Sequence, residues 1–118
     1  EADLSLTVGD VPVIIEVKSG ADQKLLRSVG DAYRDAIGEG VVVVASVTPD
    51  RPALLVWVTD SFVAKGLKAG DIVREAAKAI GGGGGGRPQF AQAGGKNADG
   101  MSDAVARIVK IVSKTAGT

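Results

Sequence analysis

The stretch GGGGGGRPQFAQAGGK, residues 81–96, is the feature around which the chain is organised. Its six consecutive glycines, Gly81 to Gly86, have no side chains to pack and lose much backbone freedom when they are ordered. Such a run can be a flexible linker, or it can present bare main-chain N–H groups to a closely approaching partner. Because the run leads into Arg87-Pro88 and a segment containing Phe90 rather than into serines, we expect residues 81–96 to form a glycine-rich loop that is ordered, or becomes ordered on binding.

Two familiar nucleotide-binding motifs do not match this loop. A P-loop follows a strand, opens a helix and carries Lys-Ser or Lys-Thr, and the dinucleotide fingerprint also needs a preceding strand. Here the glycines follow a predicted helix, so they lie at its partially negative end. Anion binding would therefore depend on the N–H groups of the loop itself, together with Lys96 and the planar guanidinium of Arg87.

The composition allows one domain and excludes several kinds of chemistry. The chain has 118 residues, of which 45% are hydrophobic and only 3% aromatic, so we expect a core of aliphatic side chains. It contains no cysteine and no histidine, which excludes disulfides, thiol or imidazole catalysis and the common zinc sites. The 14 basic residues balance 14 acidic ones, so any contact with nucleic acid must come from a local patch. No apolar run is long enough to span a bilayer, so no membrane is expected.

Hydrophobic patterns predict an α/β (α+β) fold, with a small mixed β-sheet packed by three to four helices in a single domain over residues 1–118. The predicted strands are alternating or continuously apolar, and they are residues 4–8, 11–17, 41–47 and 53–58. The predicted helices have apolar residues at helical spacing, and they are residues 22–37, 60–65, 71–80 and 101–114. The proline-containing turn at 48–52 predicts an antiparallel pair, whereas the helix that precedes residue 41 predicts a parallel crossover.

Simple structural roles account for most of the remaining polar and aromatic residues. Trp57 is expected in the core or at an edge of the sheet, and Phe90 is expected to anchor the end of the glycine loop; for both rings, stacking on a base is the alternative. Ile111 falls outside the apolar stripe of the last helix and is either a surface residue or a contact with another domain. Carboxylates near predicted helix starts are expected to act as caps, and they are Asp60, Asp71, Asp99 and Asp103. Because no nucleophile–base pair can be assembled, we expect no catalytic site in this chain.

Residues 81–95 resemble the glycine-rich signature near the C-terminus of alanyl-tRNA synthetases, where an Ala-Gln-Ala-Gly-Gly segment follows, here residues 91–95. The segments ADQKLLRS, 21–28, and VAKGLKAG, 63–70, are also similar to that family. The resemblance runs from about Val11 to about Val112 and implies a DHHA1-like domain, a type shared with DHH phosphoesterases. We therefore expect a C-terminal fragment of a larger ATP-dependent alanine–tRNA ligase. The parent would use ATP, magnesium and zinc elsewhere, with no cofactor in this fragment.

The resemblance implies a cytoplasmic tRNA-binding module that meets the elbow of tRNA and helps position tRNA(Ala) for aminoacylation and editing. The implied partners are tRNA, the remainder of the synthetase and a second copy of the chain. Two alternatives stay open, namely the nucleic-acid-binding domain of a DHH-family phosphoesterase and a dimerisation module of the synthetase. Such phosphoesterases tend to carry a shorter glycine run that ends in histidine, whereas Arg87 stands at that place here.

The candidate nucleic-acid-binding residues are local cations and the glycine loop: Lys65, Lys68, Arg74, Lys78, Gly82, Gly83, Gly84, Gly85, Gly86, Arg87, Gln92 and Lys96. With a net charge of zero, we expect binding to be weak, salt-dependent and directed at backbone shape rather than base sequence. Arg27, Asp31 and Arg34 are spaced to pair along one helix, and they form either an ordinary solvated face or a phosphate-facing edge.

Overall fold

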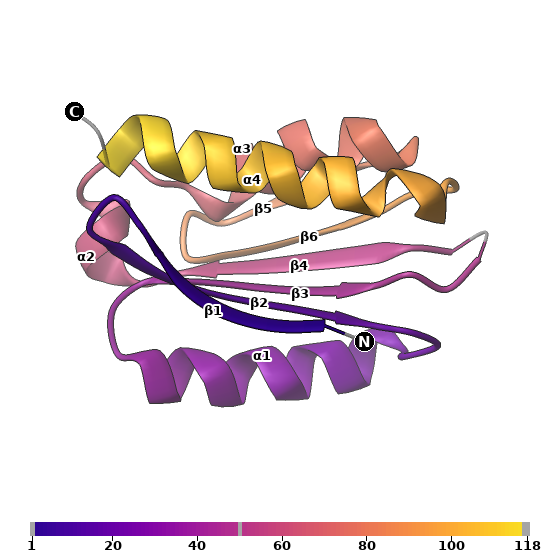
Figure 1. Ribbon diagram of the computed structural model, residues 1–118, viewed down its shortest axis with the longest axis horizontal. Coiled ribbons are helices and arrows are strands. Elements are labelled where there is room, and N and C mark those ends of the chain that lie inside the picture. The colour runs from indigo at the N-terminus through magenta and orange to yellow at the C-terminus, as the bar shows by residue number, and fades with distance from the viewer. Residues whose placement is uncertain (1, 50, 117–118) are drawn as a thin grey trace.

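The computed structural model describes residues 2–49 and 51–116, which form one six-stranded sheet with helices on both faces (Figure 1). The strands are β1 (Ala2–Val8), β2 (Val11–Lys18), β3 (Val41–Ser46), β4 (Ala53–Val58), β5 (Gly83–Gly86) and β6 (Phe90–Gly94). The helices are α1 (Gln23–Ile37), α2 (Asp60–Val63), α3 (Ala69–Ala77) and α4 (Met101–Ala116), with 3-10 turns η1 (Lys78–Ile80) and η2 (Ala98–Gly100). The strand order is β1-β2-β3-β4-β6-β5, with β2 and β3 parallel and the other neighbours antiparallel. The predicted α/β fold with a mixed sheet is confirmed.

Different helices cover the two faces of the sheet. α1 packs on β3 and β4 from one side, whereas α3 and α4 pack on the opposite side (Figure 1). Every residue of β3 and β4 is buried, as their continuous apolar runs predict, because these middle strands contact both helical layers. The larger core cluster lies on the α3–α4 side of the sheet, and the smaller one, which includes Leu26 and Trp57, lies under α1.

The α1 helix begins and ends where the sequence predicts. Asp22 is the N-cap, and its Oδ1 accepts a hydrogen bond from the Leu25 N–H at 2.9 Å. Gly38 follows the helix with a φ of 72°, and its N–H donates to the Arg34 carbonyl. The apolar residues at helical spacing in α1 are not all buried, so their spacing indicates the buried face only in part. Leu25 is 48% exposed, and Ala32 and Ala36 are exposed as well.

A glycine in the middle of α1 sets how closely this helix approaches the sheet. A Cβ on Gly30 would overlap the indole ring of Trp57, so only glycine leaves room for that ring. Trp57 is 1% exposed, and its Nε1–H donates to Asp31 Oδ1 at 3.0 Å. The prediction that Trp57 is a core residue is confirmed, and its one polar group is satisfied by α1.

The glycine-rich stretch at 81–96 is largely a β-hairpin, so its prediction as a loop is wrong. β5 is an edge strand made entirely of glycine, and it pairs with β6 from Gly83↔Gly94 to Gly86↔Ala91. A Cβ on Gly84 would run into the backbone of β6, and one on Gly86 would lie 2.7 Å from Ala91 Cα. The strands therefore approach each other more closely than side chains would allow. Glycine is generally disfavoured in strands, but here the absence of side chains permits the close approach of β5 to β6.

Two smaller expectations are also corrected by the structure. Ile111 is half-buried and packs against the larger core cluster, so it is part of the internal packing of this chain. The predicted caps Asp60, Asp71 and Asp103 lie within the first turns of α2, α3 and α4, not at their N-cap positions. Carboxylates in a first turn are favourable because they face the positive end of the helix dipole.

Candidate nucleic-acid interface

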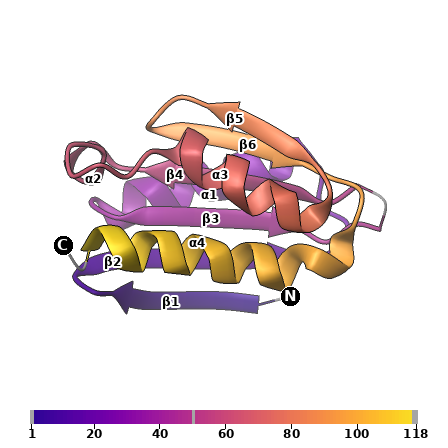
Figure 2. The same ribbon diagram turned by 90° about the horizontal axis from the view of Figure 1, so that it is seen from above.

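The hairpin formed by β5, β6 and the turn 87–89 presents one face that α1 leaves accessible. Ala91 and Ala93 are buried in the larger core cluster, on the side of the sheet that α3 and α4 cover. Because side chains alternate along a strand, Phe90, Gln92 and Gly94 point to the opposite side, where Gln92 and Gly94 are exposed. We call these three residues the hairpin face. Figure 2 shows the hairpin at one edge of the sheet and β1 at the other.

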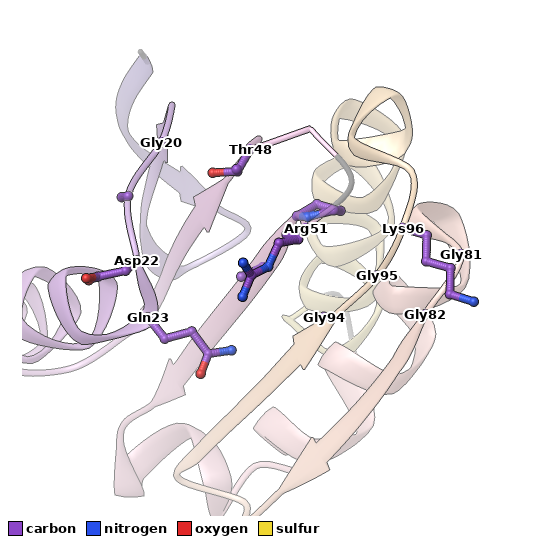
Figure 3. A pocket seen from close by; sticks show the side chains of 13 residues that line it. Gly20, Asp22, Gln23, Thr48, Arg51, Gly81, Gly82, Gly94, Gly95 and Lys96 are labelled. Atoms are coloured by element: carbon purple, nitrogen blue, oxygen red, sulfur yellow. The ribbon is translucent and has the colours of Figure 1, made fainter.

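A hollow of about 790 Å³ lies at one end of the hairpin face. It is bounded by the start of α1, the β3–β4 turn and the base of the hairpin, where Gly81, Gly82, Gly94 and Gly95 line it. Figure 3 shows the Arg51 side chain directed toward the start of α1, and Lys96 directed away on the far side of the hairpin base. The hollow thus combines the Arg51 cation with exposed glycine backbone, which suits an anionic ligand, while the Asp22 carboxylate at its rim already accepts the Leu25 N–H.

A second hollow of about 540 Å³ lies at the other end of the hairpin face. Three arginines line it, Arg27 and Arg34 from α1 and Arg87 from the hairpin turn. The Arg34 guanidinium lies 3.4 Å from Asp31 Oδ1 and 3.1 Å from Asp35 Oδ1, so its charge is already balanced. Among the described residues, Arg87 has no acidic partner within ion-pairing distance, so it is the cation of this hollow that is most available to a ligand.

Phe90 connects the second hollow to the core. Its ring lies 4.9 Å from that of Trp57, centroid to centroid, at an interplanar angle of 54°. The expectation that Phe90 anchors the end of the glycine stretch is confirmed, because this half-buried ring joins β6 to the cluster under α1. The Arg87 N–H donates to the Phe90 carbonyl at 2.9 Å and closes the turn between them.

The structure does not bring all the predicted cations onto one face. Lys68 precedes α3, while Arg74 lies on α3 and pairs with Asp71 at 3.0 Å. Lys78 pairs with Glu75 at 3.0 Å. These residues belong to the α3 layer, on the side of the sheet opposite the hairpin face, although the Arg74 guanidinium reaches the edge strand β5, 3.9 Å from where a Cβ on Gly85 would lie. Lys65 lies beyond the end of α2, with its Nζ 4.9 Å from the centre of the Phe62 ring.

Glu75 links two of the basic residues on the α3 layer. A hydrogen bond from Lys78 and the charge of the same ammonium lower the pKa of the Glu75 carboxyl, with a further contribution from Arg107. Arg107 on α4 lies 3.5 Å from Glu75 Oε1 and 3.2 Å from Asp103 Oδ2. The cations of the α3 and α4 helices are therefore partly neutralised by their neighbours.

Three arginines near the hairpin are absent from the predicted nucleic-acid-binding residues, namely Arg51, Arg27 and Arg34. Arg51 precedes β4, and its place beside the hairpin follows from the register Ala53↔Gly94 between β4 and β6. The Arg27 guanidinium Cζ lies 4.0 Å above the centre of the Phe90 ring, a contact between segments more than sixty residues apart in the sequence. Local sequence patterns predict neither the place of Arg51 beside the hairpin nor the contact of Arg27 with Phe90. The spacing of Arg27 and Asp31 did predict that these two residues pair.

The described part of the chain holds neither a metal-binding cluster nor a membrane-spanning helix. In residues 2–49 and 51–116, no three His, Cys, Asp or Glu side chains come together as a metal site would require. Within the same ranges, no helix combines the length and the apolar character needed to cross a bilayer.

The comparisons with known proteins agree with this architecture. The model of the family described as "DHHA1 domain" matches residues 10–115. The alanine–tRNA ligase of Alkaliphilus oremlandii is 41% identical over 110 residues, which are 93% of this chain and 12% of that ligase. The alanine–tRNA ligase of Anaeromyxobacter dehalogenans is 41% identical over 113 residues, covering 96% of this chain and 12% of the ligase. The chain thus spans about an eighth of the length of these relatives.

Two solved structures share the fold. The crystal structure of the C-Ala domain from Aquifex aeolicus alanyl-tRNA synthetase superposes with a TM-score of 0.85 and 31% identity, covering 93% of this chain and 98% of that one. A DHH-domain member of the s1p family of ribosomal proteins has a TM-score of 0.65 at 16% identity, covering 95% of this chain and 28% of its own, and shows the fold alone. The chain therefore belongs to the DHHA1 domain family, as a C-terminal domain of the alanyl-tRNA synthetase type.

Proposed function

We propose that this domain is the tRNA-binding C-terminal module of an alanine–tRNA ligase, and that it helps to position tRNA(Ala) for aminoacylation and editing. The match to the C-Ala domain over nearly its whole length supports this assignment. Because the chain spans about an eighth of its curated relatives, the remainder of the ligase is proposed as its partner, with ATP, magnesium and zinc used there. A cytoplasmic location belongs to the same proposal.

The observation that carries the proposal is the set of cations without acidic partners around the hairpin. Among the described residues, Arg51, Arg87 and Lys96 have no carboxylate within 4.0 Å, whereas Arg74 and Lys78 each have one at 3.0 Å. An unpaired cation can release counterions from a phosphate without first breaking an ion pair. We therefore place the RNA backbone along the hairpin, between the two hollows, with glycine backbone allowing close approach.

Fluorescence anisotropy with labelled tRNA, measured against salt concentration, tests this placement. The double variant Arg51→Ala/Arg87→Ala should bind more weakly and reduce the salt slope by about one unit for each phosphate that is no longer neutralised. The matched control Arg74→Ala/Lys78→Ala removes the same charge from the α3 layer and should change both quantities less. A control variant that loses as much affinity as the hairpin variant would contradict the assignment of the interface to the hairpin.

The alternatives from the sequence predict other results in the same series. A dimerisation module would sediment as a dimer in analytical ultracentrifugation and would leave tRNA unbound. A phosphoesterase-type domain would bind single-stranded DNA as well as tRNA. ATP–pyrophosphate exchange or deacylation of mischarged tRNA by the 118-residue chain would contradict a purely binding role.

A further inference from the structure

Three side chains from separate elements form a column from the core to solvent at the second hollow. Trp57 on β4 is 1% exposed, Phe90 on β6 is half-buried, and the Arg27 side chain on α1 is 49% exposed. The rings of Trp57 and Phe90 are 4.9 Å apart, and the Arg27 guanidinium lies 4.0 Å above Phe90. The guanidinium is therefore the outermost layer, with one side against the ring and substantial exposure to solvent.

The Arg27 guanidinium is held by a second contact besides the ring. Arg27 Nε lies 3.6 Å from Asp31 Oδ1, the same oxygen that accepts the Trp57 Nε1–H at 3.0 Å. Asp31 is thus fixed by a buried indole and in turn holds Arg27 over Phe90. A side chain positioned in this way has less rotamer entropy to lose when a ligand stacks on it.

The charges around this column favour a nucleobase over a phosphate. Arg27, Arg34 and Arg87 line the hollow together with Asp35, Glu39 and Asp60, while Asp31 pairs with two of the arginines. The charges of Arg27 and Arg34 are therefore balanced by carboxylates of α1 itself, which leaves no free positive charge to hold an anion at Arg27, whereas Arg87 stays the unpaired cation of this hollow. A base has a polarisable face without a full charge, and it can stack on a guanidinium plane or an aromatic ring.

We propose that the Arg27 guanidinium, supported by Phe90, is a stacking platform for an unpaired nucleobase of the bound RNA. The inference rests on the proposed RNA-binding function and names the part of the RNA that this face recognises. Gln92 is the next residue of the hairpin face along β6, and its exposed amide offers a donor and an acceptor to a base edge. A base inside a duplex cannot reach the platform because both of its faces are already stacked, so the ligand is a nucleotide from a loop or a bulge.

The test compares two conservative variants of α1 and two RNAs. Arg27→Lys keeps the positive charge but removes the planar guanidinium. Arg34→Lys is the matched control, because Arg34 also pairs with Asp31 but does not lie over the Phe90 ring. The probes are a stem–loop RNA with 2-aminopurine in its loop and a blunt duplex of the same stem. Stacking contributes about 1–3 kcal/mol per base, so Arg27→Lys should weaken stem–loop binding by about 5-fold or more.

The outcomes separate this inference from the proposed function. We expect the wild type to prefer the stem–loop and to quench 2-aminopurine, Arg27→Lys to lose both properties with an unchanged salt slope, and Arg34→Lys to retain them. If the wild type binds stem–loop and duplex equally, or if the two variants behave alike, the stacking platform is refuted while RNA binding stands. If the wild type binds neither probe nor tRNA, the proposed function itself fails. Circular dichroism of each variant verifies that it is folded.

Discussion

The alternation of close and open glycines in β5 predicts opposite effects for two neighbouring alanine substitutions. A Cβ on Gly84 would run into the Gln92 carbonyl oxygen and lie 2.5 Å from Ala93 Cβ, whereas a Cβ on Gly83 has nothing within 4 Å. Neither glycine has a positive φ, so the difference is steric. Gly84→Ala should lower the free energy of unfolding by about 1–3 kcal/mol, because β5 must move away from β6. Gly83→Ala should raise it by about 0.4–1 kcal/mol, because alanine restricts the unfolded chain.

Thermal unfolding followed by far-UV circular dichroism measures both effects. For a chain of this size, 1 kcal/mol corresponds to a change in Tm of about 4 °C. Gly84→Ala should therefore lower Tm by about 4–12 °C, and Gly83→Ala should raise it by about 2–4 °C. Urea unfolding of each variant shows whether the transition remains two-state. Equal shifts, or a Gly84→Ala variant that is more stable than wild type, would mean that the glycine run is a mobile linker and that the paired strand β5 is wrong.

Three other predictions address the core, an ion pair and the interface. Leu26→Ala removes a fully buried side chain between α1 and the sheet and should lower the free energy of unfolding, measured with urea, by about 2–5 kcal/mol. A decrease below about 1 kcal/mol would contradict the packing of α1. Because the pKa of Glu75 is lowered, its ionised carboxylate stabilises the fold at pH values above its ordinary pKa. This stabilisation is lost as the pH falls through the lowered pKa. An NMR titration of Lys78→Ala should show the Glu75 pKa higher than in wild type, and an unchanged value would refute the role of that ammonium. Arg87→Ala should weaken tRNA binding by at most about 1.5–3 kcal/mol with Tm nearly unchanged, and wild-type affinity would remove Arg87 from the interface.

The central part of the fold could be predicted because its residues carry a hydrophobic signal. β3 and β4 are continuous apolar runs joined by a turn with two prolines, and their burial follows directly. β5 could not be predicted in the same way, because glycine has no side chain and therefore no apolar periodicity. Its strand conformation depends on β6 alongside it and on α3, where a Cβ on Gly70 would lie 2.9 Å from the Gly86 carbonyl oxygen.

The candidate site could be predicted only where its residues are close in sequence. Arg87 lies in the hairpin turn and Lys96 follows β6, because each directly follows glycines in the sequence, and both line hollows at the ends of the hairpin. Arg51 and Arg27 reach the same region through strand register and through the packing of α1, which local sequence does not encode. Arg74 lies near the glycines in sequence, but it is on α3 and pairs with Asp71. Its charge is therefore less available to a phosphate than its position in the sequence suggests.

A tRNA titration followed by NMR of the ¹⁵N-labelled chain would locate the RNA on the domain, because it reports backbone amides and arginine Nε groups at once. We predict that the largest shifts fall on the hairpin, at Gly83, Gly85 and Gln92, and on the Nε groups of Arg27 and Arg87. The glycine amides are separate reporters of close backbone approach, since they carry no side chain of their own. Shifts confined to the outer surfaces of α3 and α4, with the hairpin unaffected, would instead place the RNA on the opposite side of the sheet and refute the hairpin interface.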